Sequence, residues 1–186
     1  MKVWTWLLLA IVCARPLSAQ VVAQPEPPLD SARASLRDAL LVLRDTLATI
    51  DAAAARLQRD YREASGASLL SRARVMRDAC GRSIRTIPPA RGTVLNAKLS
   101  TAKRQKARTE LVSAMDTLKG VLIRCEKEFA AMSQPDQAET VRGYANDRAV
   151  RILGGLRRYD HSLRNFLALM GIRVIPLGVT PPAVAG

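Results

Sequence analysis

The chain has 186 residues, with 29 lysines and arginines against 16 acidic residues, so its formal net charge is +13 at neutral pH. Aromatic residues make up only 4% of the chain, too few for the aromatic and β-branched strands of a β-sandwich. The length is enough for one domain with a hydrophobic core and does not require two.

Residues 1–19 have the layout of a cleavable secretory signal peptide. Lys2 precedes an apolar run from Val3 to Val12, and small residues surround Ala19. This run has about half of the roughly 20 apolar residues that span a bilayer, so we expect no transmembrane segment after cleavage. The N-terminus therefore predicts an exported protein, periplasmic or extracellular, cut after Ala19 or, as the alternative, after Ala23.

The first predicted helix runs from about 31 to 64. Residues 20–29 before it carry three prolines and are expected to form an extended lead that is not helical. Asp30 and Ser31 then offer an N-cap. Apolar residues follow at alternating spacings of four and three, which is the pattern of a helix packed nearly parallel to its neighbours: Leu36, Leu40, Leu43, Leu47, Ile50, Ala54, Leu57 and Tyr61.

A second, shorter helix is predicted from Ser68, which follows a turn containing Gly66. The prolines Pro88 and Pro89 are expected to end it, with a link reaching Thr93. Its apolar positions are Leu69, Ala73, Met76, Cys80, Ile84 and Ile87.

The third helix is clearest from residue 111 onward, where the spacing of four and three returns. Its apolar positions are Leu111, Met115, Leu118, Leu122, Cys125, Phe129 and Met132. The fourth helix is predicted to start near Pro135 and to end at Gly171. Gly154 and Gly155 weaken its middle, and residues 172–186 form an irregular tail. Its seam positions are Val141, Ala145, Arg148, Ile152, Gly155, Tyr159, Leu163, Phe166 and Met170.

These elements predict an all-α fold, an antiparallel up-down four-helix bundle with a short second helix, over residues 30–171. Short turns between helices favour this arrangement, because it buries all four apolar stripes together. The alternative is a long antiparallel coiled-coil hairpin in which the first two helices fuse through Gly66.

Two cysteines remain after cleavage, Cys80 and Cys125, and an even number in an exported protein suggests a disulfide. If the second and third helices simply folded back at Pro88, the two would lie tens of ångströms apart. The bond therefore requires residues 88–93 to run extended along the bundle. The alternative is two separate buried thiols.

No catalytic, metal or cofactor motif is recognisable in the sequence. His161 is the only histidine, so one chain has no histidine cluster for a metal. Gly154 and Gly155 stand inside a helix and indicate close packing or a kink rather than a phosphate loop. We therefore expect a protein that is not an enzyme and has no cofactor.

Positive charge is concentrated between residues 72 and 108, where eleven basic residues face a single acid, Asp78. Extending the third apolar stripe backward places Arg104 and Arg108 at core-facing positions, beside a notch that the short second helix leaves open. There they would need an anion or a carboxylate as partner. The candidate anion-binding residues are Arg91, Lys98, Lys103, Arg104, Lys106 and Arg108. The alternative is an ordinary solvated surface.

The first functional hypothesis is thus an exported, non-enzymatic bundle that binds an anionic envelope partner, such as lipid, lipopolysaccharide, a wall polymer or an acidic protein. Nucleic acid is a poorer candidate, because aromatic residues are not interleaved with the charges and the protein is predicted to be exported. The second hypothesis is a bundle that encloses a small apolar ligand, and the third is an enzyme of unrecognised type.

Overall fold

A computed structural model of the protein describes residues 31–178, and this part of the chain is all-helical, without any strand. The expected all-α class is therefore confirmed for these residues. The predicted signal peptide at 1–19, the extended lead at 20–29 and the last eight residues of the tail lie outside the described residues. Within the described range, no helix is long and apolar enough to cross a membrane.

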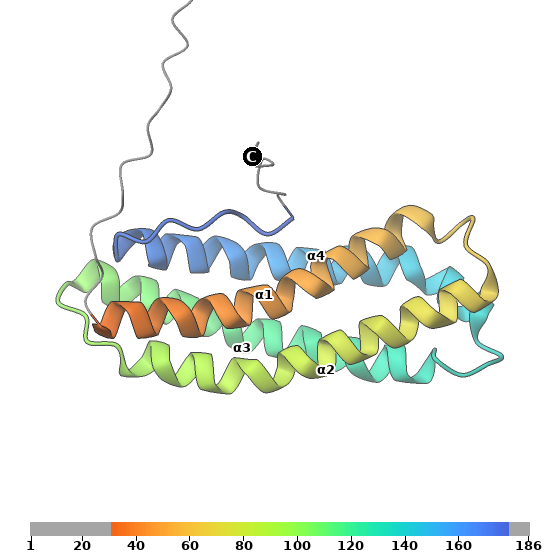
Figure 1. The fold of residues 1–186 in the computed structure, drawn as a ribbon, viewed down its shortest axis with the longest axis horizontal. Coiled ribbons are helices and arrows are strands. Elements are labelled where there is room, and N and C mark those ends of the chain that lie inside the picture. Colours follow the sequence, from red (N-terminus) through yellow and green to blue (C-terminus); the bar gives the residue numbers. More distant parts are fainter. Residues whose placement is uncertain (1–30, 179–186) are drawn as a thin grey trace, which may run out of the picture.

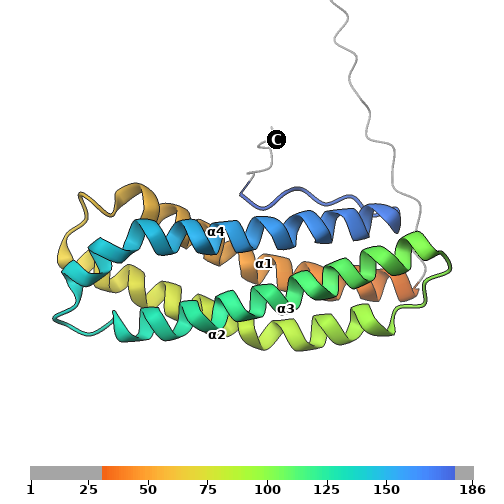
Figure 2. The same cartoon turned by 180° about the vertical axis from the view of Figure 1, so that it is seen from behind.

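The helices are α1 (Ser31–Asp60), α2 (Gly66–Asn96), α3 (Ala102–Ala131) and α4 (Ala138–Leu169). They lie side by side along the long axis of the molecule, and the chain reverses direction from each helix to the next (Figures 1 and 2). A turn over residues 61–65 separates the first two helices. They therefore do not fuse through Gly66, as the hairpin alternative would require.

The predicted apolar stripes form the core between the helices. Every stripe residue within α1 is buried, as is every one predicted for the third helix, whereas Tyr61, in the turn after α1, is half-buried. In α2, Ile84 is only half-buried. In α4 the stripe passes through Ala149, which is fully buried, rather than through the predicted Arg148, whose side chain is 21% exposed.

The second helix is not short: α2 spans 31 residues and contains both prolines. Pro88 and Pro89 are exposed on its outer face, where each lacks one backbone donor. A proline inside a helix costs about 3 kcal/mol. The helix continues because the turns around the prolines bury Ile87, Ala90 and Val94, and burial of such side chains is worth about 1.5 to 3 kcal/mol each for the larger ones.

The predicted extended link over residues 88–93 is consequently wrong, and so is the notch beside it. The chain reverses later, at residues 97–101, after α2 has covered the region where a wall was expected to be missing. Thr101 then caps α3, its side-chain oxygen accepting from the backbone amide of Arg104 at 3.3 Å. Such a cap satisfies one of the unpaired amides at a helix start.

The predicted disulfide joins Cys80 of α2 to Cys125 of α3, with a Cα–Cα distance of 6.2 Å. Both residues are buried in the core, as their stripe positions indicated. The predicted partners are therefore right and the predicted connection is wrong, because a longer α2 brings the cysteines together without an extended link.

The start of α4 also differs from expectation, whereas its end does not. Pro135 lies in the turn before α4, three residues ahead of the first helical residue. Gly171 ends the helix as predicted, with a positive φ of 78° that suits glycine. The tail then runs back over α4 and α1 (Figure 1), where Arg44 of α1 donates to the carbonyl of Ile175 and Asp160 accepts from the amide of Leu177.

Candidate functional site

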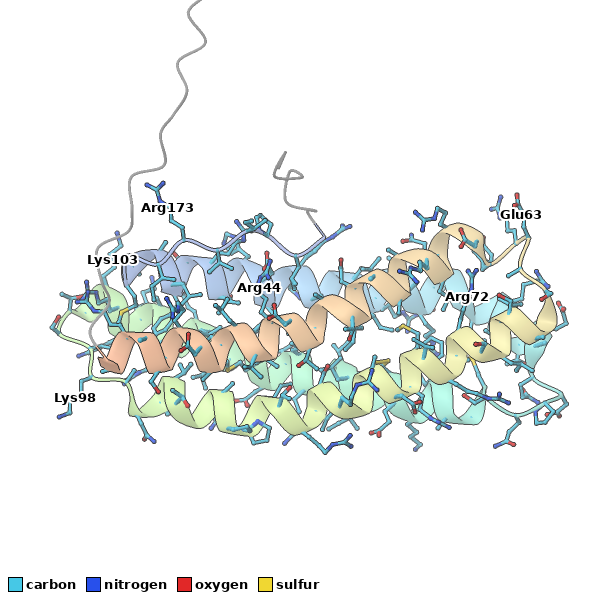
Figure 3. The ribbon with its side chains drawn as sticks, in the orientation of Figure 1. Arg44, Glu63, Arg72, Lys98, Lys103 and Arg173 are labelled. Atoms are coloured by element: carbon cyan, nitrogen blue, oxygen red, sulfur yellow. A yellow bond between two sulfur atoms is a disulfide. The ribbon has the colours of Figure 1, made fainter. Side chains whose placement is uncertain are left out.

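Most of the predicted basic residues lie at one end of the molecule. This end, which we call the turn end, consists of residues 31–36, 93–108 and 170–173, from the start of α1, the α2–α3 turn with the start of α3, and the residues that follow α4. Figure 3 shows Lys98, Lys103 and Arg173 there, whereas Glu63 and Arg72 lie at the opposite end.

The three predicted lysines, Lys98, Lys103 and Lys106, are exposed. Lys98 belongs to the α2–α3 turn, and the other two stand on the first two turns of α3. No ion pair among residues 31–178 includes any of them. Their ammonium groups are therefore available to an anion from solution.

Arg108 lies at the α2 C-terminus, where its Nη1 donates to the carbonyls of Leu95 and Ala97 at 3.3 and 3.4 Å. The expected core-facing position is wrong for this residue. Ala107, 3% exposed, holds that position. It lies four residues before Leu111 and therefore on the same face of α3.

Arg104 is half-buried and lies against the C-terminus of α4. Its Nε donates to the carbonyl of Leu169 at 2.9 Å, and its Nη1 to the hydroxyl of Ser100 at 3.4 Å. Its partners are thus neutral dipoles rather than the anion or carboxylate that the sequence argument required. A neutral partner leaves the formal charge of the guanidinium uncancelled, so both arginines still contribute positive potential.

Arg91 does not join this group as an available cation. Its Nε and Nη2 contact the two carboxylate oxygens of Asp116 on α3, at 2.9 and 3.1 Å. Such a bidentate pair is geometrically specific, and it neutralises the charge of Arg91. We therefore leave Arg91 out of the candidate site.

The turn end is also hollowed. A surface cavity of about 710 Å³ is bounded by α1, α2, α3 and the end of α4. Its charged lining residues are Arg33, Lys98 and Arg104, and Ser35, Asn96 and Ser100 supply further polar groups. Arg33 and the exposed Arg173 were not predicted to belong to this end, because each lies far along the chain from the basic segment and no spacing rule connects them.

The helix dipoles largely cancel at this end, so its positive potential comes from side chains. The N-termini of α1 and α3 carry partial positive charge, and the C-termini of α2 and α4 carry partial negative charge. Arg108 and Arg104 lie against these two C-termini and offset the negative contribution. The combined result is an end at which cationic side chains outnumber nearby acids.

Nothing in the described range resembles a metal centre, since no group of three His, Cys, Asp or Glu side chains there could hold an ion. His161 is exposed on α4, as its position off the apolar stripe indicated. The fold and the site define a basic, disulfide-linked, all-α protein. No protein-family model, curated protein or solved structure matches the chain.

Proposed function

We propose that this is an exported, non-enzymatic helical protein that binds an anionic envelope partner through the turn end. The observation that carries the proposal is the set of exposed lysines at the turn end, which make no ion pair among the described residues: Lys98, Lys103 and Lys106. Lys98 also lines the turn-end cavity. Arg104 and Arg108 add charge behind them while holding two helix ends in place.

The proposal includes the architecture, an antiparallel up-down four-helix bundle. Short turns connect each helix to the next. The first helix, α1, packs against α4, the last in the chain, as well as against α2. Such a bundle places the α1–α2 and α3–α4 turns at one end and the α2–α3 turn at the other. The α2–α3 turn is thereby presented at an end of the molecule, where a large flat partner can reach it.

A lipid surface that carries negative charge suits this site. Lysines on flexible stems at the tip of a rod-like molecule can reach lipid phosphates without any helix entering the bilayer. Each basic residue near an anionic membrane surface contributes about 1 kcal/mol, and the attraction decays within a Debye length. Lipopolysaccharide, wall polymers and acidic proteins offer the same type of charge to the same lysines.

The test is binding of the full chain to anionic vesicles, to neutral vesicles and to anionic vesicles at high salt. The triple variant Lys98→Gln/Lys103→Gln/Lys106→Gln should bind anionic vesicles on the order of 100-fold more weakly, at about 1 kcal/mol per lysine. The matched control is Arg74→Gln/Arg82→Gln/Lys127→Gln, which removes equal charge from exposed positions away from the turn end.

The control should retain at least most of the affinity. Equal losses from both triple variants would show that only net charge matters, which contradicts a site at the turn end. Binding that is undiminished by high salt would favour the apolar-ligand hypothesis instead, because burial of apolar surface is not screened.

A further inference from the structure

A second basic cavity lies on the outer face between α3 and α4, away from the turn end. Its volume is about 390 Å³. Val121, Cys125 and Glu128 of α3 form one wall, and α4 from Arg148 to Arg158 forms the other. The disulfide at Cys125 ties the α3 wall to α2, so one side of the cavity is fixed covalently.

Four arginines line this cavity, and carboxylates neutralise only two of them. Arg148 pairs with Glu128 at 3.3 Å, and Arg151 pairs with Asp147 at 3.0 Å. The other two, Arg124 and Arg158, are exposed, and no ion pair within residues 31–178 includes either. The cavity therefore carries two positive charges that the surrounding acids leave in place.

Glycine keeps the α4 side of the cavity open. A Cβ built on Gly154, which lines the cavity, would meet no atom within 4 Å. Gly155 is different, because its Cβ would touch the Val121 side chain at 3.4 Å, so this residue lets the two helices approach. The pair thus has two roles: Gly155 brings α3 and α4 together, and Gly154 leaves space between the arginines.

We propose that this cavity binds the phosphate group of a small ligand, with Arg124 and Arg158 as its two cationic contacts. Two guanidinium groups from opposite helices match a group with two negative charges, and the planar fork of arginine suits phosphate oxygens better than an ammonium does. The site shares no residue with the turn end. Failure of the membrane proposal therefore does not affect this one, and the reverse also holds.

Calorimetric titration of the full chain with inorganic phosphate and with pyrophosphate tests the proposal. Wild-type protein should bind at least one of them with micromolar to millimolar affinity, and Arg124→Gln/Arg158→Gln should weaken that binding at least tenfold. Arg74→Gln/Arg82→Gln on α2 is the control of equal charge and should change the affinity less than twofold. No heat at millimolar phosphate or pyrophosphate, or equal losses in both double variants, would overturn the proposal.

A second variant separates a cavity from a merely positive surface. Gly154→Leu leaves every charge unchanged but fills the space between the arginines, so it should abolish binding. Because glycine is a poor helix former, the same change should not lower the melting temperature. Binding that survives in a folded Gly154→Leu protein would show that no cavity is used.

The source of the phosphate is resolved by comparing probes. Vesicles containing phosphatidic acid present a phosphate at a lipid headgroup, whereas glycerol phosphate presents a similar group in solution. If the ligand is soluble, Arg124→Gln/Arg158→Gln weakens glycerol phosphate binding and leaves vesicle binding unchanged. If it is a headgroup, the double variant weakens vesicle binding even when the turn-end lysines are already replaced. If the double variant weakens neither glycerol phosphate binding nor vesicle binding, the assignment of these arginines is contradicted.

Discussion

Arg142 of α4 donates from its Nη2 to the backbone carbonyl of Ala64, in the turn that follows α1, at 2.9 Å. The same guanidinium donates from Nη1 to the carbonyls of Tyr61 and Arg62 at 2.9 and 2.8 Å. Arg108 likewise donates to a carbonyl at the C-terminus of α2, and Arg104 to one at the C-terminus of α4. At three helix C-termini, an arginine from another helix thus donates to the terminal carbonyls. Part of the arginine content therefore has a structural role and does not imply ligand binding.

Replacing Arg142 should destabilise the fold. Arg142→Gln removes a charged donor from three carbonyls, and hydrogen bonds to charged groups contribute about 1.5 to 3 kcal/mol each when buried. Because this site is only partly buried, we expect a total loss of about 1 to 3 kcal/mol. Urea denaturation followed by circular dichroism measures it. Arg74→Gln is the control and should shift stability by less than about 0.5 kcal/mol; a similar loss in both would refute the capping role.

Tyr159 carries the only buried hydroxyl that lacks a hydrogen-bond partner among the described tyrosines. Burial, with a smaller contribution from Asp160, raises the pKa of Tyr159 far above its ordinary value, against a lowering effect of Arg44. The folded state therefore holds the phenol proton more tightly than the unfolded state does. This advantage is complete below about pH 10, where the unfolded phenol ionises, and it is lost as the pH rises further.

We therefore predict that Tyr159→Phe stabilises the protein or leaves it unchanged at pH 7, because no hydrogen bond is lost. Above about pH 10, the wild type should lose stability faster than the variant, by up to about 1.4 kcal/mol per pH unit. Denaturation midpoints of both proteins across the alkaline range provide the measurement. Parallel curves would mean that the Tyr159 hydroxyl is solvated.

The helices could be predicted from the sequence because their apolar spacing is regular, and the buried residues of α1, and those of α3 from Leu111 onward, lie where that spacing placed them. The end of α2 could not. Pro88 and Pro89 are strong local stop signals, yet residues that become buried only after the helices pack, such as Ala90 and Val94, carry the helix past them. Tertiary packing outweighs the local preference there.

The candidate site was predicted less completely than the fold. Lys98, Lys103 and Lys106 were found because they are clustered in sequence. The roles of Arg104 and Arg108 were not, because the carbonyls that they contact become neighbours only in the folded chain. Arg124 and Arg158 gave no signal at all, since in sequence they resemble any solvated charge on the outer face of a helix.

The disulfide should contribute substantially to stability. Cys80 and Cys125 are 45 residues apart, and closing a loop of that size stabilises a protein by about 4 kcal/mol in the chain-entropy treatment. Reductant should therefore lower the denaturation midpoint of the wild type, whereas Cys80→Ala/Cys125→Ala should be insensitive to it. Intact mass after alkylation should show no free thiol at these two positions before reduction, and two accessible thiols in the native protein would contradict the bond.

The most direct measurement of the central claim asks which end of the molecule meets an anionic membrane. The only tryptophans are Trp4 and Trp6, both within the predicted signal peptide, so the exported form should have none and a single new tryptophan can report its own surroundings. Ser100→Trp places one in the α2–α3 turn, and Ala67→Trp places one at the opposite end, both at exposed positions. On anionic vesicles the emission of Ser100→Trp should shift to shorter wavelength while that of Ala67→Trp stays unchanged, with neither shifting on neutral vesicles. A shift at Ala67→Trp alone, equal shifts at both positions, or vesicle binding without a shift at Ser100→Trp would contradict a membrane contact through the turn end.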